Sequence, residues 1–113
     1  MSALLNRMAV VLRPKQPYAD WANGVDDDGP RFDLEEHRKS PTCYLVDEEV
    51  GPDEHQSMVR HYSEYLFEEW LHGWMTDEAF WPKDRSWKVF QEWFDWEVLE
   101  PVFDVSDSPL EEE

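Results

Sequence analysis

The strongest hydrophobic pattern in the chain has helical periodicity and covers residues 52–72. At 100° per residue, apolar side chains fall on one face and charged side chains on the other. The predicted apolar face consists of Met58, Val59, Tyr62, Tyr65, Leu66 and Trp70. Pro52 suits the first turn of such a helix, and Gly73 suits its end. The pattern therefore predicts one long amphipathic helix.

A second helical stripe, made of aromatic residues, predicts a helix over 85–94 for which Asp84 is a suitable N-terminal cap. Its apolar face consists of Trp87, Phe90 and Phe94. Two shorter helices are predicted over 17–23 and over 34–39, and Asp33 provides the cap of the second one.

Three segments have the composition of β-strands. A continuous apolar run over 8–12 predicts a strand that is buried on both faces and therefore central in its sheet. Residues 42–46 carry β-branched and aromatic side chains, which predicts a second strand. Residues 98–105 alternate between apolar and acidic, which predicts a third strand. Pro101 places that strand at an edge or gives it a bulge, because proline has no N–H to donate.

The element order β-α-α-β-α-α-β predicts an α+β fold, in which a small three-stranded sheet is covered by the two aromatic-rich amphipathic helices. The length of 113 residues fits a single domain. We assign this domain to residues 8–105. A loose lead-in over residues 1–7 precedes it, and an acidic, flexible tail over 106–113 follows it.

The chain is strongly acidic, with 27 Asp and Glu against 10 Lys and Arg and a net charge of −17. This balance argues against nucleic acids and anionic membrane surfaces as partners, since both attract basic patches. It favours a basic protein as a partner. The sequence shows neither a signal peptide nor an apolar run long enough to cross a membrane, so we expect a cytoplasmic protein.

One candidate site lies on the polar face of the long predicted helix. Spacings of three, four and four residues bring four side chains to one side of it, namely His61, Glu64, Glu68 and His72. Imidazole and carboxylate ligands suit Zn, Mn or Fe. A single helix rarely closes a metal site, however, and the same spacing arises on any acidic, solvated helix face. A metal site and a solvated face are therefore the two interpretations.

Glu69 falls among the apolar residues of the same helix, which makes it the second candidate. A buried carboxylate must pair with a cation or take up a proton. Arg13, Lys15 and Arg85 are the cations that could reach it. The alternative is that Glu69 lies at the rim of the apolar face and extends into solvent.

Three tryptophans lie off the helical stripes: Trp74, Trp81 and Trp93. Tryptophan is favoured at the energetic centres of protein interfaces, so we choose these three, with Glu69, as candidate partner-binding residues. The alternative for each is an ordinary place in the core.

Catalytic motifs are absent from the sequence. The serines lie in no Gly-x-Ser-x-Gly context, and the four glycines form no phosphate-binding loop. Cys43 is the single cysteine, so it has no disulfide partner within the chain. We therefore predict no catalytic residue and no cofactor, and this absence of motifs weighs against an enzyme without excluding one.

Three segments of the chain resemble sequences of other proteins. They are residues 10–21 (VVLRPKQPYADW), 76–82 (TDEAFWP) and 103–107 (FDVSD). With them, the chain resembles a small, uncharacterised family of bacterial proteins over most of its length. The resemblance implies a bacterial, cytoplasmic origin, and it brings neither an activity nor site residues.

These observations favour a small acidic protein-binding domain, of the inhibitor, immunity-type or regulatory kind. It would present exposed tryptophans within an acidic rim to a basic partner. A metal-binding protein or hydrolase that uses the His/Glu helix face is the first alternative. The second is a binder of a small ligand in an aromatic-lined pocket.

Overall fold

The computed structural model describes residues 3–25, 28–48 and 52–112. The predictions made for residues 1–2 and 113, at the ends of the lead-in and the tail, lie outside the described residues. Within the described residues, helices and strands combine into the predicted α+β class, with a small antiparallel sheet and four α-helices. The detailed strand arrangement differs from the prediction.

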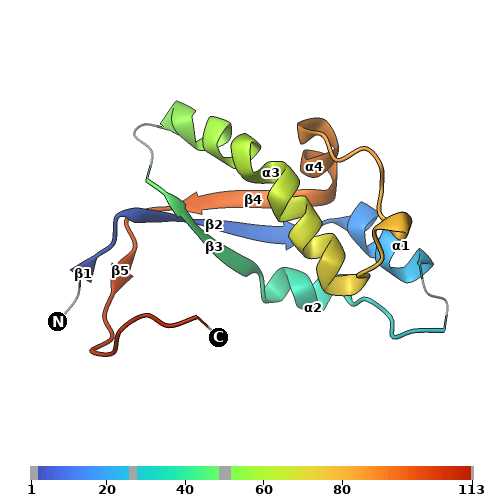
Figure 1. Ribbon diagram of the computed structural model, residues 1–113, viewed down its shortest axis with the longest axis horizontal. Helices are drawn as coiled ribbons and strands as arrows, with labels where there is room; N and C mark the ends of the chain where they lie inside the picture. Colours follow the sequence, from blue (N-terminus) through green and yellow to red (C-terminus); the bar gives the residue numbers. More distant parts are fainter. Residues whose placement is uncertain (1–2, 26–27, 49–51, 113) are drawn as a thin grey trace.

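A three-stranded antiparallel sheet forms the centre of the molecule (Figure 1). Its middle strand, β2 (Arg7–Pro14), pairs with β3 (Thr42–Asp47) on one side and with β4 (Phe94–Leu99) on the other. The central position predicted for residues 8–12 is therefore confirmed. Three side chains of β2 are fully buried on the face that the helices cover: Met8, Val10 and Leu12.

The predicted strand over 98–105 is wrong in its extent, because two strands in two different sheets share this region. β4 ends at Leu99, and β5 (Phe103–Asp104) pairs with β1 (Ala3–Leu4) in a separate two-stranded ribbon. Pro101 lies between β4 and β5, where a residue without an N–H interrupts the ladder. The ribbon extends away from the body of the molecule (Figure 1), and Ala3–Leu4 of the predicted loose lead-in belongs to it.

β4 also begins four residues earlier than the predicted strand. The preceding helix, α4 (Trp87–Trp93), ends one residue before β4, and Phe94 already has extended φ and ψ angles of −137° and 143°. The spacing of Trp87, Phe90 and Phe94 fits a helix, whereas Phe94, Trp96 and Val98 fit a strand. Pairing of these residues with β2 decides in favour of the strand.

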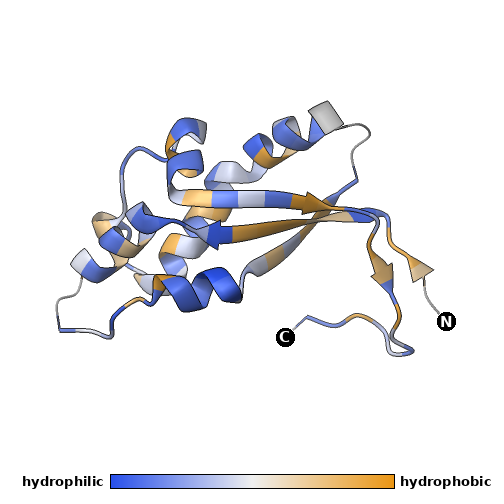
Figure 2. Ribbon diagram, turned by 180° about the vertical axis from the view of Figure 1, so that it is seen from behind, coloured by the Kyte–Doolittle hydropathy of each residue, from blue (hydrophilic) through white to orange (hydrophobic). Residues whose placement is uncertain are grey.

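The remaining helices surround the core. They are α1 (Gln16–Gly24), α2 (Leu34–Lys39) and α3 (Pro52–Trp74), with a short 3-10 turn η1 (Glu78–Phe80) after α3. α3 and α4 lie on one face of the sheet, and Figure 2 shows the strands from the opposite side, in front of these two helices. On that opposite face Leu45 is exposed.

The buried stripe of α3 differs from the predicted one. Phe67 and Leu71 are fully buried, whereas Tyr65, which was predicted to face the core, is 60% exposed. The stripe is centred on the side of Phe67 and Leu71, and Tyr65 lies more than 90° away from that centre at 100° per residue. Gly73 does not end the helix, because Trp74 adds a further residue and its indole Nε1 donates to the carbonyl oxygen of Ala22 at 2.8 Å.

Tyr18 connects α1 to the rest of the core. Its hydroxyl donates a hydrogen bond of 2.6 Å to the carbonyl oxygen of Trp70 on α3. Its ring contacts Phe32, Trp70 and Phe94, with centroid distances between 5.1 and 5.6 Å. Only 2% of Tyr18 is exposed, so its hydroxyl depends on this one partner for its hydrogen bond.

We predict that Tyr18→Phe lowers the free energy of unfolding by about 1–2 kcal/mol, because the change leaves the buried carbonyl oxygen of Trp70 without this donor. Urea denaturation measures the change. Tyr65→Phe removes an exposed hydroxyl and is the matched control, with an expected change within about 0.5 kcal/mol. Equal effects of the two substitutions would contradict a stabilising role of the Tyr18 hydrogen bond.

Candidate functional site

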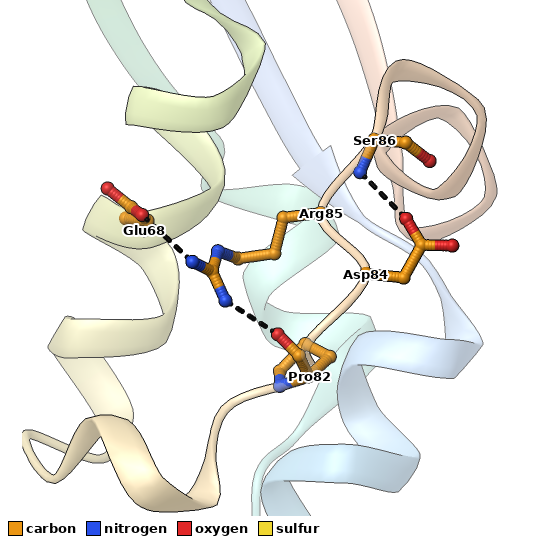
Figure 3. A network of polar contacts seen from close by, with 5 residues as sticks. All are labelled: Glu68, Pro82, Asp84, Arg85 and Ser86. Carbon is orange, nitrogen blue, oxygen red and sulfur yellow. Dashed lines mark hydrogen bonds and ion pairs between the residues drawn. The ribbon is translucent and has the colours of Figure 1, made fainter.

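The four residues of the predicted metal face do not form a site. His61, Glu64 and His72 are exposed along α3. Glu68 is engaged by Arg85, whose Nη2 lies 3.3 Å from its Oε1 (Figure 3). Among the described residues, no group of three or more His, Cys, Asp or Glu side chains comes together in a way that could hold a metal ion.

Arg85 links α3 to the segment that leads into α4. Besides Glu68, it binds the carbonyl oxygen of Pro82 through Nη1 at 2.8 Å (Figure 3), and its guanidinium lies 6.0 Å from the centroid of the Trp81 ring. The cap of α4 is Ser86, whose Oγ accepts from the N–H of Val89, so the prediction of Asp84 as the cap is wrong.

Asp84 instead supports the capping residue. Its Oδ1 accepts from the N–H of Ser86 at 3.0 Å (Figure 3). Hydrogen bonds from Ser86 lower the pKa of Asp84, because they favour the charged carboxylate.

We predict that Arg85→Ala lowers the free energy of unfolding by about 1–2 kcal/mol, since it removes the bond to Pro82, the half-exposed ion pair with Glu68 and the packing on Trp81. Lys83→Ala, which removes an exposed cation two residues away, is the control and should change stability by no more than about 0.5 kcal/mol. Thermal and urea denaturation measure both. If Arg85→Ala were as mild as the control, the link between α3 and the α4 segment would carry no stability.

The three tryptophans chosen as anchors are half-buried, and each makes contacts within the protein. Trp74 binds the carbonyl oxygen of Ala22, and Trp81 Nε1 donates to that of Met75 at 2.7 Å. The ring of Trp93 lies 5.2 Å from that of Phe67. All seven tryptophans lie in the part of the chain that the structure describes, and each is half-buried.

A groove runs between β3 and α3. Its middle section has a volume of about 430 Å³ and lies between Tyr44, Leu45 and Val46 of β3 and Tyr62 and Tyr65 of α3. Because successive side chains of a strand point to opposite faces, a cavity that contacts three consecutive residues of β3 must open at the edge of the strand. The groove therefore exposes the edge of β3 that is not paired with β2.

The groove extends in both directions along β3. Towards the start of the strand, a cavity of about 230 Å³ lies between Thr42, Glu69 and Trp74, and it shares Tyr44 with the middle section. Towards the end of the strand, a third cavity of about 330 Å³ shares His61 and Tyr62 with the middle section. We call these three neighbouring cavities, which share lining residues, the β3–α3 groove.

The groove combines an apolar middle with acidic ends. Leu45 and Tyr65, in the middle, are 51% and 60% exposed. Glu69 lines one end, and Asp47 and Glu54 line the other. None of the described residues that line the groove is a Lys or an Arg. An extended, basic segment with apolar side chains matches this arrangement.

Glu69, one of the predicted partner-binding residues, is exposed at the rim of the groove. Arg85, a predicted partner for it, pairs with Glu68 instead. Burial and the negative charge of Glu69 raise the pKa of Tyr44 to about 12. The acidic rim therefore acts electrostatically on the aromatic wall of the groove.

We predict that Tyr44 stays protonated until well above its ordinary pKa of 10.0 and that Glu69→Gln brings its ionisation to lower pH. NMR of ¹³C-labelled tyrosine, assigned with Tyr44→Phe, measures this titration. Because the native pKa exceeds the unfolded one, the native state holds more protons above pH 10. The contribution of Tyr44 to the free energy of unfolding is therefore complete below pH 10 and is lost as the pH rises towards about 12. An unchanged Tyr44 titration in Glu69→Gln would contradict the coupling.

Among the groove residues that were not predicted as candidates are Tyr44, Leu45 and Tyr65. One signal was present for Tyr65. If Phe67 and Leu71 are included in the helical stripe, its centre moves away from Tyr65, which leaves an aromatic side chain on an acidic surface. No signal in the sequence distinguishes the free edge of β3 from a paired edge, because that depends on the order of the strands.

Comparisons of the chain with protein-family models, with curated proteins and with solved structures gave no match. The resemblance of residues 10–21, 76–82 and 103–107 to a bacterial family therefore stays a prediction. In the described part of the chain, no helix is both long enough and apolar enough to span a membrane.

Proposed function

We propose that this protein is a protein-binding domain of the inhibitor or regulatory kind, and that its β3–α3 groove takes up a basic segment of another protein. The observation that carries this proposal is that exposed apolar groups lie between acidic ends in a row of three neighbouring cavities along β3. Trp74 lines one end of the groove, whereas Trp81 and Trp93 lie outside it. Tyr65 and Leu45 therefore serve as the exposed anchors.

Size and charge support a protein segment as the ligand. Tyr65 offers a large exposed ring, and truncation of such an aromatic anchor at an interface commonly costs about 2 kcal/mol or more. The net charge of −17 attracts a basic partner over distances of about a Debye length, which speeds association at low salt. Apolar contacts would then determine the dissociation rate.

A small-molecule ligand is less well supported. The cavity next to Trp74 is lined by Tyr18, Phe32 and Trp70, so it has the aromatic walls expected for that function. Its volume of about 230 Å³ is below the range of about 300–1,000 Å³ that is usual for ligand pockets. The middle section, at about 430 Å³, lies within that range, but it opens at the edge of β3. The cavity next to Trp74 also shares Tyr44 with the middle section, and this adjacency favours a ligand that extends along several cavities.

The test is selection from a display library of twelve-residue peptides, followed by affinity measurement on synthetic copies. We expect the selected peptides to be enriched in Lys and Arg together with aliphatic or aromatic residues, and to bind more weakly as salt rises. Glu69→Lys should weaken binding at least fivefold, because it reverses a charge at the rim. Glu92→Lys, an equal change at an exposed site on α4, should alter affinity by less than about twofold.

A second pair of variants tests the apolar contact. Tyr65→Ala should weaken the same peptides at least tenfold, which corresponds to about 1.4 kcal/mol. Phe80→Ala is the matched control, since this aromatic residue is 51% exposed and lies outside the groove. Equal losses in both variants of either pair, or selected peptides without basic residues, would overturn the proposal.

A further inference from the structure

β3 has one edge that is available for pairing. In the described structure β3 pairs only with β2, so every second residue of β3 directs its N–H and C=O groups away from the sheet. The middle cavity of the groove reaches this edge. Protein sheets usually protect an exposed edge with lysine, proline or a bulge. The sequence of β3, Thr-Cys-Tyr-Leu-Val-Asp, contains neither lysine nor proline, and its register with β2 is continuous from Thr42 to Asp47.

We propose that the partner segment binds as an additional β-strand on this edge, so that it becomes the fourth strand of the β2–β3–β4 sheet. This inference rests on the proposed function and specifies how the ligand is recognised. Main-chain hydrogen bonds to β3 supply affinity in this mode of binding, and side-chain pockets supply selectivity. At about 3.3 Å per residue, six residues span the length of β3, about 20 Å.

The placement of the groove determines the side-chain pattern of the ligand. One set of alternate side chains points towards α3, where it meets Tyr65 in the middle and Glu69 and Glu54 at the ends. The other set lies beside Leu45 on the open face of the sheet. The side chains that point towards α3, at every second position of the expected ligand, are therefore basic, apolar, apolar and basic in that order. β-forming residues lie between them.

The negative charge of the groove favours another protein as its ligand over two alternatives, the C-terminal segment of this chain and a second copy of the chain. The C-terminal segment, with Glu111 and Glu112, would bring more carboxylates to an acidic groove. A second copy would bring another net charge of −17 together with a second Glu69 and Asp47. Like charges placed opposite each other across an interface oppose association. A basic partner removes this repulsion.

The test uses the full chain and a blocked heptapeptide, Lys-Thr-Val-Thr-Phe-Thr-Lys, which carries the expected pattern. A peptide selected in the display experiment serves as a second probe. Each probe is made with a single backbone N-methyl group at each position in turn. We expect a loss of at least tenfold in affinity at alternate positions and less than about twofold at the positions between them, because only every second N–H faces β3.

Hydrogen exchange provides an independent readout. On binding either probe, the outward amides of β3 should become protected, whereas the amides on the free edge of β4 should be unchanged. β4 is a suitable internal control because it has the same length of six residues and also pairs with β2 on one side only.

Three outcomes would overturn strand addition. If the probes bind and N-methylation gives the same affinity at every position, the groove binds proteins by side chains alone, and the proposed function survives. If neither probe binds, both the function and its mode are wrong. If sedimentation shows a dimer that the peptides dissociate, the edge of β3 belongs to a second copy of the chain.

Discussion

β2 is held between two antiparallel neighbours, and this arrangement governs the positions of the other elements. Because β2 buries side chains on one face against α3 and α4, and pairs along both of its edges, β3 and β4 must each lie at an edge of the sheet. The chain then crosses from β3 through α3 to α4 and β4. That crossing sets α3 beside the free edge of β3, so the groove follows from how the core is closed.

The high tryptophan content is explained by connections between elements. Indole nitrogens of Trp21, Trp74 and Trp81 donate to the carbonyl oxygens of Phe80, Ala22 and Met75. Each ring thus buries apolar surface and at the same time satisfies a carbonyl group in a helix end or connecting segment. In a small domain with short helices this combination holds α1, the end of α3 and η1 together. Of these three, Trp74 also lines one end of the groove, and Tyr65 lies exposed in its middle section.

Local sequence patterns predicted those features of the fold that depend on residues close together in the chain. The bounds of α2 are those predicted, the run 8–12 lies in the central strand, and the long helix begins at Pro52. The differences arise where distant contacts decide. Phe94 suits a helix and a strand equally, and pairing with β2 selects the strand. Of the predicted site residues, Glu69, Trp74 and His61 line the groove and the others do not, because the strand order that creates it is a property of the whole fold.

The unpaired edge of β3 also affects the tendency of the protein to self-associate. An open strand without lysine or proline is a template on which other copies can assemble, and here the mutual repulsion of negatively charged molecules opposes that encounter. The sequence has an isoelectric point of about 4.3, so acidification towards this value removes the repulsion while the edge stays open. The same carboxylates that would attract the proposed basic ligand therefore oppose self-association of the free protein at neutral pH.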